Sequence, residues 1–133
     1  CSFSVKKQLK NKKTQFGFVF NLDKHTGKGT HWVALLCDLD REGIFFYDSY
    51  GIPPHKEIQG LINKIMKECR GLRKKMIFSY NKTRHQFKYS ECGIFCIHFL
   101  ITMIENDISF PDYCKKPLTD DKMLKLRNTY FID

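Results

Sequence analysis

The segment RHQFKYSECGIFCIHFL, which runs from Arg84 to Leu100, changes character in its middle, where a polar loop ends at a Cys-Gly step and an apolar run with helical spacing begins. This pattern predicts a helix that starts at Cys92. The N–H groups of a first helical turn have no partner within the helix and form the positive end of its dipole, so a Cys at that place has its thiolate favoured. The segment therefore predicts a reactive thiol.

A second donor accompanies this thiol. Gln86 lies six residues before Cys92, and a loop could bring its side-chain amide beside the sulfur. A nucleophile, a backbone N–H and a Gln amide together suit the negative oxygen that develops on an attacked carbonyl. The segment thus favours nucleophilic attack on a carbonyl group.

The rest of the chain has the pattern of an α+β protein. From about Glu91 to Asn106 the predicted helix is apolar on almost every side, which is typical of a buried central helix. Apolar residues also recur at helical spacing from Ile58 to Cys69, which predicts an amphipathic helix lying on a sheet. A linker containing Pro and Tyr precedes a last short helix, from Asp120 to about Asn128. Four segments are rich in aromatic and β-branched residues and are expected to be strands: Phe16–Phe20, His31–Leu39, Ile44–Asp48 and Lys75–Tyr80.

Length and composition limit the organisation of the chain. Its 133 residues, 42% hydrophobic and 14% aromatic, suffice for one buried core, so residues 1–133 are expected to form a single domain. Residues 1–14 are basic and polar, and we expect a mobile arm or a short helix there. No apolar run of about 18 residues and no secretory signal is present, which predicts a soluble, intracellular protein. The first residue is Cys rather than Met, which indicates a processed product or a piece of a longer chain.

Cysteines and charge carry further information. The six cysteines include no CxxC pair and lie mostly in apolar patterns, so we expect reduced thiols in a reducing compartment. The net charge is +9, from 23 Lys and Arg against 14 Asp and Glu. Positive charge gathers at residues 6–13, 67–75 and 115–116. This positive charge is compatible with an acidic partner such as nucleic acid. It is equally compatible with a solvated surface that has no specific partner, and we weigh the two alternatives equally.

Thiol chemistry needs a base that takes the Cys proton and a third group that orients the base. His31 opens one predicted strand and Asp48 closes the next, which makes them the best candidates. If the turn sets Asp40 opposite Gly43, Asp48 faces Leu35, at roughly 13 Å from His31 by strand rise. A bulge, a strong twist or a bent strand end would then have to bring the two side chains together.

Each of these residues also has an ordinary structural interpretation. Taken singly, a His before Trp is more often a loop residue, a Cys in a buried helix a packing residue and an Asp before Ser-Tyr-Gly a turn former. His25, His55 and His98 are alternative bases, although the first two lie in loops marked by Gly or Pro and the third lies in mid-helix. Cys96 could be a resolving thiol or, with His98, a metal ligand. Residues two apart point apart on a helix, which favours a core position for Cys96.

The joint pattern resembles the ubiquitin-like-protein proteases, a family that comprises the SUMO-deconjugating enzymes and the adenovirus-type viral maturation proteases. Its members have a His-Trp pair, an acid seventeen residues after the His, and a Gln six residues before a Cys-Gly that opens the central helix. This chain has the same residues at the same spacings: His31-Trp32, Asp48, Gln86 and Cys92-Gly93. The match extends over about residues 16–106, and the last helix is similar to the family's C-terminal ending.

The resemblance implies a papain-like-clan core, in which a mixed or antiparallel sheet of about four strands packs on a central helix that starts at the nucleophile, with flanking helices. It implies that Cys92 is the nucleophile, His31 the general base and Asp48 the orienting acid. Gln86 and the backbone N–H of Cys92 would form the oxyanion hole.

The resemblance also implies a narrow channel for the substrate. Trp32 would roof this channel beside Gly93, and it would admit small residues, usually Gly-Gly or Gly-X-Gly, before the cut bond. Cellular members carry a substantial segment before the first strand, whereas about fifteen residues precede Phe16 here. Glu91 replaces the usual Asp beside the nucleophile. Both departures look more like relatives from large DNA viruses or mobile elements, which implies action in the host cytoplasm or nucleus or in the virion.

Three hypotheses follow. The first is a cysteine endopeptidase that matures viral polyproteins at small-residue sites. The second is an isopeptidase that removes SUMO, NEDD8 or ubiquitin from host proteins. The third is a catalytically silent module that binds nucleic acid through its Lys and Arg patches. We expect a monomer with a polypeptide substrate, no membrane partner and no required cofactor or metal, although DNA or a peptide could serve as an activator.

Overall fold

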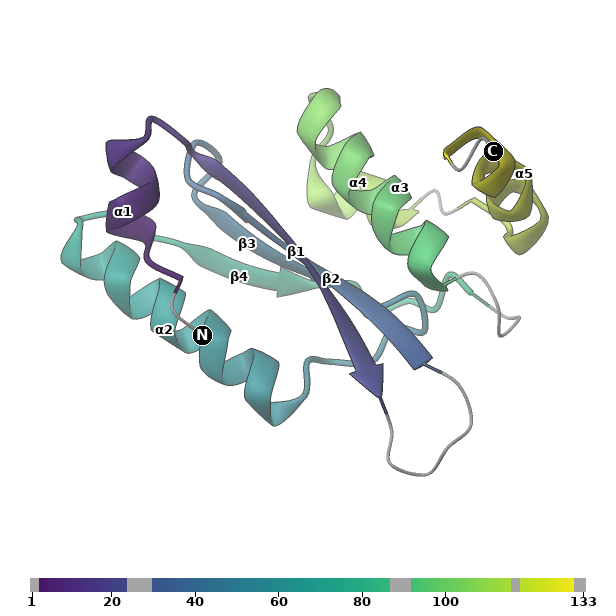
Figure 1. Ribbon diagram of the computed structural model, residues 1–133, viewed down its shortest axis with the longest axis horizontal. Coiled ribbons are helices and arrows are strands. Elements are labelled where there is room, and N and C mark those ends of the chain that lie inside the picture. The colour runs from purple at the N-terminus through teal and green to yellow at the C-terminus, as the bar shows by residue number, and fades with distance from the viewer. Residues whose placement is uncertain (1–2, 24–29, 87–91, 116–117, 131–133) are drawn as a thin grey trace.

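The computed structural model describes residues 3–23, 30–86, 92–115 and 118–130 of the chain (Figure 1). No helix in these ranges is both long and apolar enough to cross a membrane. The helices and strands follow one another in the order α1 (Val5–Lys10), β1 (Gln15–Asp23), β2 (Thr30–Asp38), β3 (Gly43–Tyr47), α2 (Lys56–Gly71), β4 (Ile77–Tyr80), α3 (Cys92–Glu105), α4 (Phe110–Lys115) and α5 (Asp120–Tyr130).

One mixed sheet organises the described residues. Its strands lie in the order β1-β2-β3-β4, with antiparallel pairing among the first three and parallel pairing of β4 with β3. The parallel pair requires a crossover, which α2 provides. Figure 1 shows α1 and α2 on one side of the sheet and α3, α4 and α5 on the other. The α+β prediction, with a four-stranded mixed sheet packed on a central helix, is confirmed.

Strand β2 is covered on both faces, which accounts for its nearly continuous apolar sequence. Val33 and Leu35 belong to the core cluster on the α2 side, whereas Ala34 and Leu36 belong to the cluster on the α3 side. All four side chains are fully buried. Because successive side chains of a strand point to opposite faces, this one strand joins the two halves of the core.

The two long helices cover the sheet in different ways. Helix α2 buries Ile58, Ile62 and Ile65 along one stripe and exposes its opposite face, as an amphipathic helix does. Helix α3 buries side chains from its first residue to Met103. Figure 1 places its N-terminal end near the start of β2, and this end carries Cys92.

The basic N-terminal residues form the short helix rather than a mobile arm. Ser4 caps α1 by accepting from the N–H of Lys7, and its hydroxyl also donates to Glu68 of α2. The N–H of Lys6 donates to the same carboxylate, and Val5 is fully buried. Helix α1 is therefore docked on the C-terminal half of α2.

The expected linker after α3 contains a helix, α4, which the sequence interpretation missed. Ser109 caps it: its hydroxyl accepts from the N–H of Asp112, and its carbonyl accepts from the N–H of Tyr113. Pro111 lies in the first turn, where a missing N–H costs nothing. A Pro after a helix often marks a linker, which is why the sequence predicts one here. A Ser followed two residues later by Pro, as in Ser109-Phe110-Pro111, is also a signal for the start of a helix.

The expected register of the β2–β3 hairpin was wrong by two residues. Gly43 pairs with Asp38, not with Asp40, and Tyr47 pairs with Ala34. The turn is longer because the Asp38 carboxylate accepts from the N–H groups of Asp40 and Arg41. This side-chain cap closes a wider loop than a simple turn does, and it moves the end of β3 closer to the start of β2.

Arg41 of the same turn forms hydrogen bonds at the C-terminal end of α3. The Arg41 guanidinium donates to the carbonyls of Met103, Asn106 and Ile108 at 3.0, 3.0 and 3.1 Å, and it pairs with Asp38. The last carbonyls of a helix lack partners within it and form its negative end, so a cation is well placed there. Arg41 thereby ties the hairpin to the end of the helix that begins with Cys92.

Candidate active site

Three elements bring the predicted site residues to one end of the sheet. His31 is the second residue of β2, Asp48 follows the last residue of β3, and Cys92 is the first residue of α3. The antiparallel pairing of β2 with β3 puts the start of one strand beside the end of the other. Contacts join all three side chains.

The His31 Nε2 atom lies 2.8 Å from Asp48 Oδ1. The separation of about 13 Å by strand rise that a simple turn predicted is therefore wrong. The observed register accounts for about half of the difference, because it moves Asp48 two residues nearer along β2. The two side chains close the remainder by extending toward each other beyond the last ladder pair.

Cys92 lies on the other side of the imidazole. A side-chain hydrogen bond joins it to His31, and since Nε2 faces Asp48, the nitrogen left for the thiol is Nδ1. The backbone N–H of Trp32 also donates to Cys92 Sγ at 3.4 Å. Only 5% of Cys92 is exposed, so these bonds form in a setting with little competing water.

The pKa values of Cys92 and His31 both shift in the direction that favours the charged form of the group. Burial raises the pKa of the Cys92 thiol, but hydrogen bonds from His31 and from the N–H groups of Trp32 and Gly93, with the charge of His31, lower it below its ordinary value. Burial lowers the pKa of His31, but its bonds with Asp48 and Cys92 and the charges of both raise it to about 9. Both pKa shifts therefore favour the charged pair, a thiolate beside an imidazolium.

The pKa of Cys92 shifts in the opposite direction to the pKa values of the other described cysteines. Burial raises the pKa of Cys37 to about 12, that of Cys114 to about 11 and that of Cys69 above its ordinary value. Burial also raises the pKa of Cys96 well above its ordinary value. Among the described thiols, Cys92 is thus the one whose pKa falls, and it is the one suited to act as a nucleophile.

Buried bonds hold Asp48 in place. Its Oδ1 atom accepts from the N–H of Tyr50 at 2.8 Å as well as facing His31. Asn81 clamps the backbone of Asp48, because its Oδ1 accepts from the Asp48 N–H and its Nδ2 donates to the Asp48 carbonyl. A carboxylate held on both main-chain and side-chain atoms keeps the imidazole in one orientation.

The Tyr50 ring packs against the face of the His31 imidazole, and Arg84 in turn contacts the Tyr50 ring. The ring of Tyr50 stacks on His31 with 4.7 Å between the ring centroids, and the guanidinium of Arg84 lies 4.9 Å from the centroid of Tyr50. Tyr50 therefore contacts both His31 and Arg84. A cation over the Tyr50 ring fixes this ring against His31.

Gln86 is fully buried beside the residue that follows Asp48. Its N–H donates to the Ser49 carbonyl at 2.9 Å, and its Oε1 accepts from the Ser49 hydroxyl at 2.6 Å. Arg84 Nε donates to its main-chain carbonyl. Residues 87–91, which connect Gln86 to Cys92 and include Glu91, lie outside the described residues.

Trp32 and Gly93, the predicted substrate residues, are neighbours. A Cβ atom placed on Gly93 would lie 3.8 Å from Cδ1 of the Trp32 indole. A side chain at residue 93 would therefore fill the space next to the indole, beside the thiol of Cys92. A Cβ atom at residue 93 would thus be in ordinary van der Waals contact with the indole.

A protein-family model described as the Ulp1 protease family, C-terminal catalytic domain, matches residues 3–133. The chain belongs to the Ulp1 protease family. The resemblance inferred from His31-Trp32, Asp48, Gln86 and Cys92-Gly93 is confirmed at the level of the family.

Two viral relatives, both named as proteases, are similar to the chain. It is 32% identical over 114 residues to R355 of Acanthamoeba polyphaga mimivirus, which carries the provisional name of thiol protease; the match covers 85% of this chain and 37% of the relative. It is 27% identical over 128 residues to S273R of African swine fever virus, named SUMO-1 cysteine protease, covering 94% and 46%. The chain spans less than half the length of these relatives.

A solved structure shows the same fold. The crystal structure of the African swine fever virus pS273R protease superimposes with a TM-score of 0.81 at 24% identity, covering 90% of this chain and 45% of that chain. The described residues therefore have the fold of an Ulp1-type cysteine protease, as the sequence predicted.

The alternative residues of the sequence analysis take no part in the contact among His31, Asp48 and Cys92, or they lie outside the described residues. His25 is outside them, and His55 is exposed at the start of α2. His98 bonds to the Tyr113 hydroxyl through Nδ1 at 2.8 Å. Cys96 is fully buried in the core. Among the described residues, no group of three or more His, Cys, Asp and Glu could hold a metal ion.

Sequence reasoning missed three residues that support the candidate site: Ser49, Tyr50 and Asn81. The first two belong to the Asp-Ser-Tyr-Gly segment, for which the sequence indicates only a turn. Asn81 follows β4, and its bond to Asp48 depends on the parallel pairing of β4 with β3. A polar residue at a strand end is a weak signal, and only the sheet order gives it a partner.

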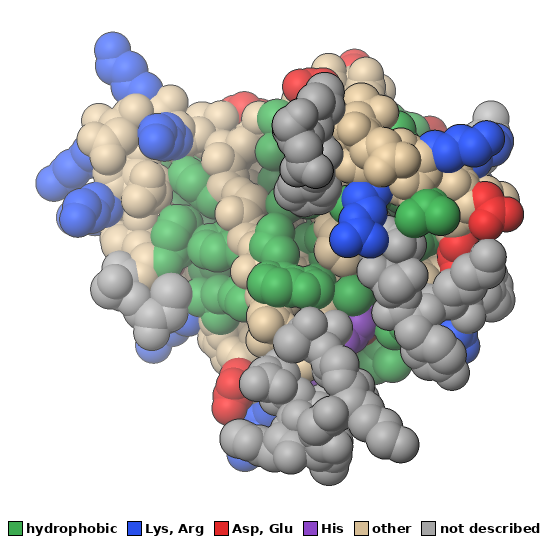
Figure 2. Space-filling view, turned by 45° about the vertical axis from the view of Figure 1, so that its right-hand side comes forward, with side chains coloured by type: hydrophobic (Ala, Val, Ile, Leu, Met, Phe, Trp, Pro, Cys, Tyr) green, Lys and Arg blue, Asp and Glu red, His purple; other side chains and the backbone are tan. Residues whose placement is uncertain are grey.

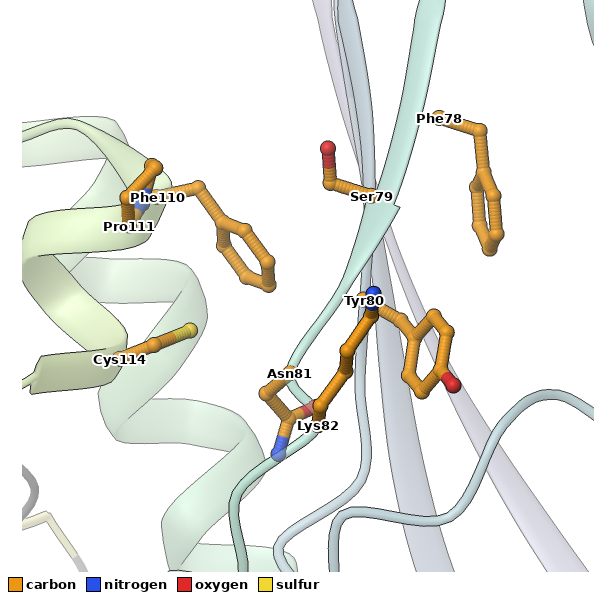
Figure 3. Close-up of a pocket in the computed structure, with 8 residues that line it drawn as sticks. All are labelled: Phe78, Ser79, Tyr80, Asn81, Lys82, Phe110, Pro111 and Cys114. Atoms are coloured by element: carbon orange, nitrogen blue, oxygen red, sulfur yellow. The ribbon is translucent and has the colours of Figure 1, made fainter.

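A cleft of about 460 Å³ lies away from Cys92, between β4 and α4. Figure 3 shows Phe78, Ser79 and Tyr80 on the strand side and Phe110 and Cys114 on the helix side. His31, Asp48 and Cys92 are not among the residues that line it. Asn81 connects the cleft with the site, because it lines the cleft and also holds the backbone of Asp48.

Proposed function

We propose that this chain is a cysteine protease in which Cys92 is the nucleophile, His31 the general base and Asp48 the acid that orients it. The observation that carries the proposal is the position of His31, which contacts Asp48 through Nε2 on one side and the Cys92 thiol on the other. The lowered pKa of Cys92 supports it. A nucleophile, a base and an orienting group in contact are the parts that thiol catalysis needs.

The reaction would proceed in two halves. The Cys92 thiolate attacks the carbonyl carbon of the scissile bond, and the electron pair of the C=O moves to oxygen. The Gln86 amide and the Cys92 N–H donate to this oxyanion. The imidazolium of His31 gives its proton to the nitrogen that leaves as an amine, which produces a thioester on Cys92. Water then loses a proton to His31, attacks the thioester and releases the acid.

The substrate would have small residues before the cut bond, because the Trp32 indole lies close to Gly93 beside the thiol. We propose cleavage of viral polyproteins at Gly-containing sites as the main activity, because thiol proteases of two large DNA viruses are the relatives described above. Cleavage of a SUMO-type isopeptide bond is the second candidate, and the name of the African swine fever virus relative favours it. The same site suits both, since the two bonds differ only in the leaving amine.

Active-site labelling would test this function. The probes are SUMO, NEDD8, ubiquitin and a Gly-Gly peptide, each with a C-terminal electrophile, and mass spectrometry locates the adduct on the wild type and on Cys92→Ala. An adduct on Cys92 with one modifier identifies a deconjugating enzyme, and an adduct with the peptide alone identifies a maturation protease. A folded sample with no adduct from any probe, with or without added DNA, would contradict the proposal.

We also propose that nucleic acid binds at the end of the molecule where α1 lies against α2. Exposed Lys and Arg side chains gather there (Figure 2), and we call this set the basic end: Lys6, Lys7, Lys10, Lys12, Lys13, Lys67, Arg70, Arg73 and Lys75. Dense positive charge on one face favours the phosphate backbone of nucleic acid. DNA bound there would act as an activator or, if the chain is catalytically silent, as its main ligand.

No cofactor or metal takes part in the proposed reaction, because a thiolate, an imidazolium and two N–H donors supply every step. A chelating agent should leave the labelling of Cys92 unchanged. The thiol must stay reduced to react, which fits a reducing compartment of an infected cell. We propose a monomer, since the contacts of the site come from one chain.

A further inference from the structure

Ser49 forms three hydrogen bonds with the segment that carries the proposed oxyanion donor. Its carbonyl accepts from the N–H groups of His85 and Gln86 at 2.7 and 2.9 Å, and its hydroxyl donates to Gln86 Oε1 at 2.6 Å. Both Ser49 and Gln86 are fully buried. Ser49 is also the residue after Asp48, so it connects the orienting acid with the oxyanion donor.

The direction of the Gln86 amide matters for the reaction. A Gln side chain has an acceptor oxygen at one end and a donor NH₂ group at the other, and the two ends have almost the same shape. Only the NH₂ end stabilises an oxyanion, whereas the oxygen end would repel it. The distance of 2.6 Å is typical of O–H···O rather than N–H···O bonds. With Oε1 at Ser49, the planar amide directs Nε2 away from Ser49.

We propose that Ser49 is a positioning residue that holds the Gln86 amide with its NH₂ group toward the attacked carbonyl. This inference rests on the proposed function, because it needs the oxyanion that this function creates. Without the hydroxyl, Gln86 Oε1 loses this short bond, and the orientation of the amide is less firmly fixed. The main-chain bonds of Ser49 remain in such a variant, so the segment keeps its place.

The test compares Ser49→Ala, Gln86→Ala and the double variant on the best substrate of the labelling panel. Loss of one oxyanion donor lowers kcat by about 100-fold to 1000-fold, and this is expected of Gln86→Ala. For Ser49→Ala we expect kcat to fall at least about tenfold with KM unchanged, because the ground state does not use the oxyanion hole. The double variant should equal Gln86→Ala. Ser79→Ala, at a position of β4 that lines the cleft, is the matched control and should behave as the wild type.

Alkylation of Cys92 by iodoacetamide separates this role from damage to the triad. Alkylation creates no oxyanion, so its rate and pH profile should be the same in Ser49→Ala as in the wild type. Ser49→Thr, which keeps the hydroxyl, should recover most of kcat. Unchanged turnover in Ser49→Ala, additive losses in the double variant, or a parallel loss of alkylation would each overturn the inference. Failure of the proposed function can be distinguished from failure of the Ser49 inference, because in the first case the wild type itself would show no turnover.

Discussion

His31 lies between two groups that both favour its charged form, and this has a consequence for the pH dependence of the site. The charged pair forms as the pH rises through the lowered pKa of Cys92, and it is lost as the pH rises through about 9, where His31 gives up its proton. We therefore expect kcat/KM to rise on the acid side and to fall on the alkaline side near pH 9. In Asp48→Asn the alkaline limb should move to lower pH, because the negative charge that raises the His31 pKa is lost and a neutral amide oxygen is a weaker acceptor for the imidazolium.

A pH profile of kcat/KM for both proteins measures this shift. Asp112→Asn is the matched control, since Asp112 is an exposed carboxylate in α4. The profile of this control should coincide with that of the wild type. An alkaline limb that stays in place in Asp48→Asn would mean that Asp48 does not act on His31.

The two cysteines of the first turns of α3 should respond differently to the same substitution. Cys92→Ala should abolish turnover and leave the melting temperature nearly unchanged. Cys96→Ala should keep turnover and lower the free energy of unfolding by roughly 1 kcal/mol, because Cys96 is fully buried in the core. Turnover assays and denaturant titrations of both variants check this, and equal losses of activity would contradict the assignment of the nucleophile.

At the scale of elements, the turn between β2 and β3 stabilises the helix that carries the nucleophile. Arg41→Ala removes bonds to three carbonyls at the end of α3. We expect the free energy of unfolding to fall by about 1–3 kcal/mol, the usual effect of losing hydrogen bonds to a charged group. Urea titration measures this change. Arg70→Ala, at an exposed position of α2, should change stability little, and an equally small effect of Arg41→Ala would show that the turn does not hold α3.

The elements could be predicted from the sequence where one local pattern dominates, as in β2 and α3. His31, Asp48 and Cys92, which the structure brings into contact, could be singled out because their spacing along the chain is specific. Their catalytic roles and the oxyanion role of Gln86 stay predictions. The register of the β2–β3 hairpin could not be predicted from the sequence, since it depends on the hydrogen bonds by which the Asp38 carboxylate caps the turn. The supporting bonds of Ser49 and Asn81 could not be found either, because both depend on segments that meet only in the folded sheet.

At the scale of the whole molecule, the basic end and the site lie at opposite ends of the sheet (Figure 1). Binding of a DNA duplex, measured by fluorescence anisotropy, should weaken steeply as salt increases, because bound cations are released from the phosphates. Lys67→Glu combined with Arg70→Glu should weaken binding and reduce the salt slope. The matched control combines Lys122→Glu with Lys125→Glu on α5. Absent binding, or equal effects of the two pairs, would exclude the basic end as the nucleic-acid site. Whether residues 1–133 form a single domain stays a prediction.

Helix α3 is fastened at both ends to one hairpin. The N–H of Trp32 meets Cys92 where the helix begins, and Arg41 meets Met103 and Asn106 where it finishes. Loosening the helix at either end would displace the sulfur from the imidazole. Activity should therefore report the fraction of folded molecules directly: on heating, the loss of turnover and the loss of circular dichroism should follow one curve, with no inactive but folded species between them.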